Sequence, residues 1–268
     1  MDASDDYVLG RGAAESVRLD AQHLLWRLHQ GYLLHPSISV TRDMRIAEVG
    51  TGTASSPIQS SFMATTISDR QFPHHDLLPE NVTLGLLNSL EDTPSELHDQ
   101  YDVVHLRMWA SNLRSRNVNM LIQNIEKMLK PGGFIQWEEA DLMHQVVKTD
   151  AATTFEANIN ELPSFMKFAN PLFALSWVHD LPKSFELQGF EVKHAEHKVF
   201  QPSQVQLCTN TYLLALKEII AGIKSTSSQV PGLNIGSHEE ALAQLLENHT
   251  RVVYNWGPLS LLAQTRRV

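Results

Sequence analysis

Cysteine is nearly absent: Cys208 is the single one among 268 residues. One cysteine excludes an intrachain disulfide and a zinc site built on thiolates, which favours a reducing compartment. Long apolar runs are also missing, since none approaches the roughly 18 residues that a membrane span needs. The start, MDASDDYVLG, carries acids where a secretion signal carries bases. We therefore expect a soluble protein of the cytoplasm that does not enter a membrane.

An excess of basic charge is missing as well. Asp and Glu number 30 against 21 Lys and Arg, so the formal net charge is -9. Because nucleic acid is a polyanion, it is not an expected partner. The chain does hold 43% hydrophobic residues, which is typical of a folded protein. Its length fits one domain with short additions, so we expect residues 1–268 to form a single domain.

Helical and strand patterns alternate along the sequence. Apolar residues recur at helical spacing over 13–30 and 117–130, and helices are also expected within 151–188, near 204–222 and over 238–252. Short apolar runs typical of buried strands lie at 44–50, 81–87, 101–106, 132–137, 189–197 and 257–265. Apolar strands joined through helices favour parallel pairing with both faces covered. The pattern predicts an α/β fold with a doubly wound sheet.

A glycine turn follows the first of these strands, in AEVGTGTA at 47–54. Without side chains, Gly50 and Gly52 let main chain approach a ligand closely. The turn therefore indicates a cradle for a nucleoside-type cofactor, provided that the bend after Val49 leaves its main chain open. A sharp corner with no ligand is the alternative that the turn alone leaves open.

Five longer motifs occur in a fixed order. They are RLDAQHLLWRLHQGYLLHP at 18–36, RIAEVGTGT at 45–53, ISDRQFPHHDLLPENVTL at 67–84, YDVVHLRMW at 101–109 and LKPGGFIQWEEAD at 129–141. In these motifs the chain resembles the class I S-adenosylmethionine-dependent methyltransferases, above all fungal enzymes of secondary metabolism. The resemblance implies a Rossmann-like fold with a helical cap (1–40), a cofactor-binding core (41–141), a helical insertion before the sixth strand (142–188) and C-terminal strands and helices (189–268). It also implies S-adenosylmethionine as cofactor and methyl transfer to a small-molecule secondary metabolite.

The resemblance assigns candidate site residues too. Glu48 would accept hydrogen bonds around the cofactor's amino-acid part, while Asn88 stands where the family usually has an acid for adenine. The implied cofactor set is Tyr7, Glu48, Gly50, Thr51, Gly52, Thr66, Asn88, Ser89, Leu106 and Arg107. The candidate bases are His105, Glu138 and His144, with His179 as a further one. No metal site is expected, because HAEH at 194–197 would turn its two histidines to opposite faces of a strand.

Two departures from the family pattern leave the activity open. Only SSPIQSSFMAT separates Ala54 from Thr66, about ten residues too few for a three-turn helix and a strand, so the first helix is expected to be shortened or lost. Thr66 also stands where the family usually has a carboxylate that binds both ribose hydroxyls. Losing that charged contact would weaken cofactor binding by about 1.5–3 kcal/mol. Three alternatives remain: an altered methyltransferase, the same fold turned to another reaction such as a pericyclic cyclisation, and a disabled, non-catalytic regulator.

Overall fold

The computed structural model describes residues 12–51, 60–110, 113, 115–149, 175–225 and 235–267. The chain divides into two compact units. The first comprises residues 1–29, 142–172 and 200–257, and the second 30–141, 173–199 and 258–268. The expectation of a single domain stays a prediction. Among the described residues, no helix has both the length and the apolar character that crossing a bilayer requires.

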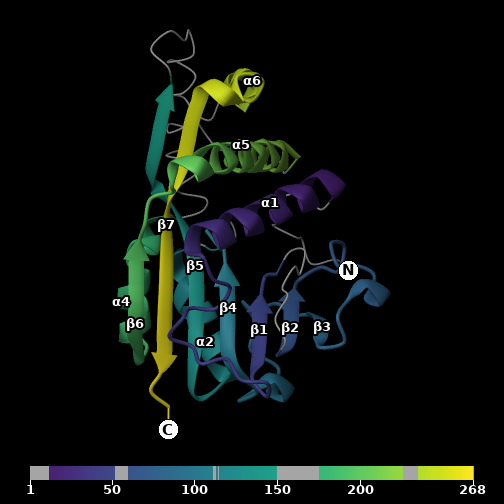
Figure 1. The fold of residues 1–268 in the computed structure, drawn as a ribbon, viewed down its shortest axis with the longest axis vertical. Helices are drawn as coiled ribbons and strands as arrows, with labels where there is room; N and C mark the ends of the chain where they lie inside the picture. Colours follow the sequence, from purple (N-terminus) through teal and green to yellow (C-terminus); the bar gives the residue numbers. More distant parts are fainter. Residues whose placement is uncertain are drawn as a thin grey trace. The chain divides into compact units, whose positions relative to one another are not determined.

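The chain forms a seven-stranded sheet with the strand order β3-β2-β1-β4-β5-β7-β6 (Figure 1), and β1, β2, β3, β4 and β6 lie entirely in the second unit. The strands are β1 (Arg45–Val49), β2 (Ser61–Thr66), β3 (Val82–Leu86), β4 (Tyr101–Arg107), β5 (Leu129–Thr149), β6 (Phe190–His197) and β7 (Val252–Thr265). Neighbours from β3 to β5 pair in parallel, whereas β6 and β7 are antiparallel. The carboxyl ends of β1, β2 and β4 therefore meet at one edge of the sheet. The expected Rossmann-like α/β fold is confirmed.

Apolar side chains cover both faces of the central strands, which explains why these strands do not alternate polar and apolar residues. On one face, Ile46 and Val103 pack in a buried cluster with Ile38 from the preceding loop. Next to β4, α2 (Ser115–Met128) buries Leu121, Ile122 and Ile125 completely. The sheet therefore places the ends of β1 and β4 on a rigid, fully packed base.

Aromatic rings hold the elements that follow β5. The ring of Trp137 in β5 lies 5.7 Å from that of Trp177 in η3 (Leu175–Val178), a short 3-10 helix. Phe185 of α4 (Leu181–Leu187) lies 5.3 Å from Phe190 of β6 in an edge-on contact. These contacts fix η3 against β5 and α4 against β6.

The first unit contains three helices, α1 (Ala13–Gln30), α5 (Pro202–Ser225) and α6 (Ile235–Glu247). The guanidinium of Arg18 in α1 forms two hydrogen bonds with the carboxylate of Glu218 in α5. Farther along, the amide of Gln204 in α5 donates to the carbonyl of Leu28 at 2.8 Å. Polar contacts therefore hold the N-terminal helix on α5.

Several predicted boundaries are corrected. β5 continues to Thr149, into the stretch expected to be a helical insertion, and its β-branched Val146, Val147 and Thr149 favour a strand there. The helix expected over 238–252 ends at Glu247, and β7 begins at Val252, before the expected 257–265. The second strand is retained as β2. The expected helices of 151–174 and the connection 52–59 lie outside the described residues. The remaining 3-10 turns are η1 (His75–Leu77), η2 (Ser95–Leu97) and η4 (His249–Arg251).

Candidate functional site

The glycine turn after β1 has the backbone that requires glycine. Gly50 adopts a φ of +77°, the left-handed region that side-chain-bearing residues avoid. The N–H groups of Gly50 and Thr51 donate to the carbonyl of Thr65 in β2, at 2.8 and 3.0 Å. Gly50 itself is exposed. The turn therefore holds an exposed glycine at the carboxyl end of β1.

Trp109 covers one side of this turn. A Cβ built on Gly50 would lie 2.9 Å from Cζ2 of Trp109, and the indole Nε1 donates to the carbonyl of Val49 at 3.2 Å. The chain reaches this position because Met108, directly after β4, also adopts a positive φ of 57°. The main chain of Gly50 is thus exposed on one side, while the indole of Trp109 fills the side toward which a Cβ would point.

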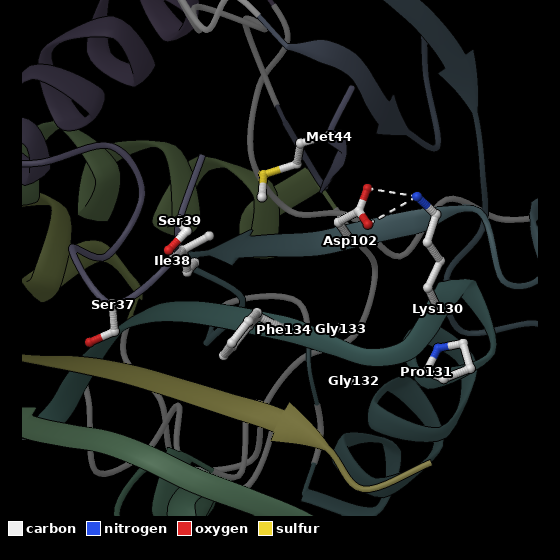
Figure 2. Close-up of a pocket in the computed structure, with 10 residues that line it drawn as sticks. All are labelled: Ser37, Ile38, Ser39, Met44, Asp102, Lys130, Pro131, Gly132, Gly133 and Phe134. Atoms are coloured by element: carbon white, nitrogen blue, oxygen red, sulfur yellow. Dashed lines mark hydrogen bonds and ion pairs between the residues drawn. The ribbon is translucent and has the colours of Figure 1, made fainter. Parts of the chain in front are cut away.

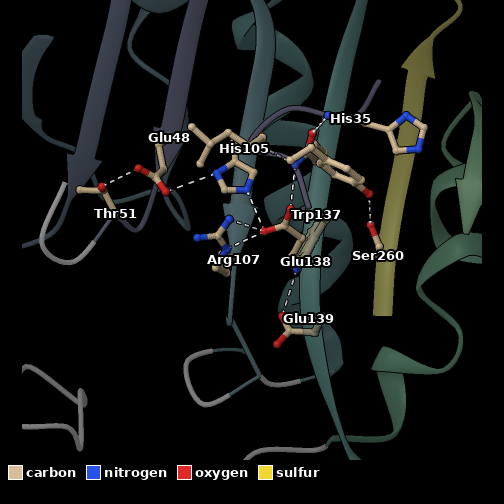
Figure 3. Close-up of polar contacts among 12 residues, drawn as sticks. His35, Glu48, Thr51, His105, Arg107, Trp137, Glu138, Glu139 and Ser260 are labelled. Carbon is tan, nitrogen blue, oxygen red and sulfur yellow. Dashed lines mark hydrogen bonds and ion pairs between the residues drawn. The ribbon is translucent and has the colours of Figure 1, made fainter. Parts of the chain in front are cut away.

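A chain of charged side chains lies behind the turn (Figure 3). The carboxylate of Glu48 accepts from the Thr51 hydroxyl at 2.7 Å and lies 3.3 Å from Nδ1 of His105. Nε2 of His105 lies 3.2 Å from Glu138, and the Arg107 guanidinium reaches the same carboxylate oxygen at 2.5 Å. The structure thus brings together Glu48, Thr51, His105, Arg107 and Glu138, which come from three separate segments of the sequence. We call these five residues the buried network.

Burial and pairing set the charges in the buried network. Burial opposes the ionisation of Glu138, yet Arg107 and His105 outweigh it and lower the pKa of this carboxyl to about 2. Burial also opposes the charge on Glu48, but His105 lowers the pKa of that carboxyl. For His105 burial disfavours the imidazolium, and the two carboxylates outweigh it and raise its pKa. A histidine held in its charged form is a weak proton acceptor, so His105 and Glu138 are better suited to position other groups than to act as bases.

Glu139, which the sequence analysis did not select, lies in a cradle of N–H donors. Its carboxylate accepts from the main chain of Trp109, Ala110 and Ala140 and from the indole of Trp137, at 2.8 to 3.2 Å. Burial nevertheless raises the pKa of Glu139 to about 7. The sequence did hold a sign of this role. The run EEAD carries several acids in a strand expected to be buried, and each buried carboxylate needs a specific partner.

The expected adenine and ribose residues have mainly local contacts. Asn88 is exposed, its amide donates to Glu91 at 2.9 Å, and its side-chain oxygen accepts from the N–H of Leu90 at 3.2 Å. The contact with Leu90 is typical of an asparagine that stabilises a turn. Thr66 is half-buried at the end of β2, with its carbonyl bonded to the N–H of Leu87.

Other predicted residues are buried or undescribed. Leu106 is 0% exposed and belongs to the core of β4, and Ser89 is 5% exposed with its carbonyl bonded to Asn124. Tyr7 and Gly52 lie outside the described residues, as does the side chain of His144. His179 is exposed, in the turn between η3 and α4.

A cavity of about 300 Å³ lies at a different edge of the sheet. It is bounded by the loop 37–39, Asp102 at the start of β4 and the turn 130–134 at the start of β5 (Figure 2). The ammonium of Lys130 pairs with Asp102 at 2.8 Å inside this region. Because β4 and β5 are parallel, their starts lie at the edge opposite the buried network. The cavity is therefore separate from the candidate cofactor site.

Comparison with known proteins finds similarity to fungal methyltransferases. The chain is 34% identical over 151 residues to methyltransferase grgD of Penicillium sp, a match that covers 50% of this chain and 52% of that protein. It is 24% identical over 152 residues to the N-methyltransferase sirN of Leptosphaeria maculans, covering 54% and 53%. The matches span about half the length of these relatives. No family model matches the chain.

A solved structure supports the fold. Phosphoethanolamine N-methyltransferase 2 of Haemonchus contortus, in complex with S-adenosylhomocysteine, superposes with a TM-score of 0.54 at 12% identity. The match covers 99% of this chain and 61% of that one. With the strand order of the sheet, these matches confirm the resemblance on which the site assignment rests. The chain has the class I methyltransferase fold, and its sequence is similar to fungal methyltransferases.

Proposed function

We propose that this chain binds S-adenosylmethionine at the carboxyl ends of β1 and β4 and transfers its methyl group to a small-molecule secondary metabolite. The observation that carries the proposal is the exposed, left-handed Gly50 two residues after Glu48, in a fold shared with methyltransferases. The similarity to fungal methyltransferases covers part of the chain and supports the same reaction class.

The residues of the site divide the work of binding. Glu48 retains acceptor capacity beside Thr51 and His105, since a carboxylate offers about four lone-pair sites, and it would accept from the cofactor's amino group. The exposed main chain of Gly50 permits close approach of the nucleoside part. Trp109 would form the wall of the site beside the glycine turn. The bound cofactor supplies a methyl group already activated by its sulfonium.

The protein's contribution to transfer is then mainly positioning, which can supply a large part of a barrier reduction. Arg107, Glu138 and His105 hold the ends of β4 and β5 in register and keep Glu48 ionised through the imidazolium. The buried network is accordingly a positioning device for Glu48. Two of the base candidates, His105 and Glu138, act in this proposal by position and charge.

Calorimetric titration with S-adenosylmethionine and S-adenosylhomocysteine tests the proposal. Both should bind the unmodified chain. Glu48→Gln should weaken binding about 10- to 100-fold, the equivalent of one hydrogen bond to a charged group. The matched control is Glu239→Gln. Glu239 of α6 has a partly exposed carboxylate that pairs with Lys224 of α5, and this variant should bind both ligands as the unmodified chain does.

The outcome also separates the alternatives. Absence of binding at millimolar concentration refutes the proposal and leaves a non-catalytic role. Binding without transfer of a labelled methyl group to any pathway intermediate, but with conversion of that intermediate, supports a cyclisation on this scaffold and refutes the transfer step. Equal binding by the Glu48→Gln variant would remove Glu48 from the site.

A further inference from the structure

Asp141, His179 and His197 come together from three different elements. Asp141 lies on β5 shortly after Glu139, His179 in the turn between η3 and α4, and His197 at the end of β6. One ligand atom from each of these three side chains lies within 4.8 Å of the other two. All three belong to the second compact unit. This is a separate cluster from the buried network.

Strand geometry explains how the cluster forms. On β6, His194 and His197 are an odd number of residues apart and point to opposite faces. The ring of His194 lies 4.7 Å from that of His35, whereas His197 meets Asp141 and His179. The same alternation that keeps His194 and His197 apart therefore places His197 beside Asp141 and His179, which are remote from it in sequence.

The elements that carry the cluster are held by packed rings. Trp177, in η3 just before His179, contacts Trp137 of β5, and Phe185 of α4 contacts Phe190 of β6. Because these aromatic contacts fix the backbones, the three side chains need only small rotations to converge. A metal ion bonded at about 2.1 Å to each ligand atom requires separations of no more than about 4.2 Å. Rotation of the two exposed imidazoles supplies that adjustment.

The donor set has the chemistry of a transition-metal site. Two imidazole nitrogens and one carboxylate oxygen suit zinc and its neighbours, whereas magnesium and calcium prefer oxygen ligands alone. Asp141 is 1% exposed and both histidines are exposed, so the negative charge lies at the inner end and the outer side is open to solvent. A buried carboxylate is stabilised by a cation placed against it.

We propose that Asp141, His179 and His197 form a binding site for one divalent metal ion of the zinc class. Three protein ligands leave at least one coordination position for water or another small oxygen or nitrogen ligand. The site links β5, β6 and the turn before α4. It is independent of the proposed methyl transfer.

A cobalt titration of the full chain tests this proposal, after dialysis against a chelator. Cobalt(II) bound by nitrogen and oxygen ligands shows visible d–d bands, and zinc displaces it from the same site. We expect one cobalt ion per chain. His179→Gln and His197→Gln should each weaken binding by at least about 100-fold, more than the loss of an outer-shell partner. Both side chains are exposed, so these variants should fold, as far-UV circular dichroism would verify.

Two controls separate this site from other histidines. His194→Gln changes the neighbouring histidine of the same strand, on the opposite face. The double variant His74→Gln/His75→Gln removes a second, exposed group formed with Asp76 at η1. Both controls should bind cobalt as the unmodified chain does.

Thermal denaturation supplies an independent readout. Zinc should raise the melting temperature of the unmodified chain and of His194→Gln, but not that of His197→Gln. If the three side chains form only a metal-free hydrogen-bonded cluster, zinc changes none of these temperatures and the d–d bands are absent, which overturns the proposal. Loss of binding in the His74/His75 double variant, or unchanged binding in His179→Gln and His197→Gln, overturns it equally.

Discussion

Replacing Glu138 with Gln removes a negative charge from the buried network while keeping the size of the side chain. Glu138 is 0% exposed and pairs with the guanidinium of Arg107, whose side chain is 9% exposed. It also contacts His105 and accepts from the amide of Gln136 at 2.8 Å. The substitution removes the negative charge that Glu138 places against this largely buried guanidinium. We expect Glu138→Gln to destabilise the protein strongly.

Two arguments from the same ion pair set the magnitude. Removing one partner of a buried ion pair costs about 3–5 kcal/mol. The fall of the Glu138 pKa from 4.5 to about 2 corresponds to about 3 kcal/mol of folded-state stabilisation. Because the folded-state pKa is lowered, this stabilisation is fully present above pH 4.5 and is lost as the pH falls through 2. The effect of Glu138→Gln should therefore be largest near neutral pH.

Urea unfolding followed by tryptophan fluorescence measures this effect. At pH 7, Glu138→Gln should lower the free energy of unfolding by about 3 kcal/mol or more, and the difference from the unmodified chain should narrow between pH 4.5 and 2. Glu239→Gln, which breaks an exposed pair with Lys224, should cost less than about 1 kcal/mol. Equal costs for the two variants at pH 7, or a Glu138→Gln cost that ignores pH, would refute the reasoning.

Three further predictions concern the glycine turn and two other buried side chains. Gly50→Ala should lower the free energy of unfolding more than Gly31→Ala does. Both glycines have φ near +80°, where alanine is strained by about 1–2 kcal/mol, but only at Gly50 would the new Cβ meet Trp109. Equal losses for the two variants in urea unfolding would contradict this. Burial raises the pKa of Glu139 to about 7, so its contribution to stability is present below pH 4.5 and lost as the pH rises to 7. The difference in unfolding free energy between the unmodified chain and Glu139→Gln should therefore change by about 3 kcal/mol between pH 4.5 and 7. A difference that stays constant over this range would count against the prediction. Burial also raises the pKa of the Cys208 thiol, so a disulfide reagent should modify it only after unfolding, and rapid reaction of the folded protein would show that it is accessible.

Elements with a clear local period were predicted well. The helix expected over 13–30 is α1, and the strands expected at 44–50 and 101–106 are β1 and β4 within a residue at each end. Their apolar spacing is a property of neighbouring residues, so it is readable without knowing the fold. The ends of β5 and β7 were not predicted, because the extension of a strand depends on which strand pairs beside it.

The candidate site was predicted as a set of residues but not as an arrangement. Glu48 and Gly50 could be placed at the end of the first strand from the motif alone. Their contacts with His105 and Trp109 could not, since these depend on the parallel register of β1 with β4. The same holds for the hydrogen bond between the N–H of Leu90 and the side chain of Asn88, which depends on the turn that follows β3.

The sequence by itself determined the order of helices and strands, the position of the glycine turn and the resemblance to methyltransferases, because these depend on short-range spacing. Only the tertiary structure decided which charges are paired, that Trp109 lies against the turn, and that Asp141, His179 and His197 converge. Strand pairing and ring packing bring together side chains that are far apart along the chain. No local pattern encodes such a meeting, because it arises from the burial of the whole apolar sheet.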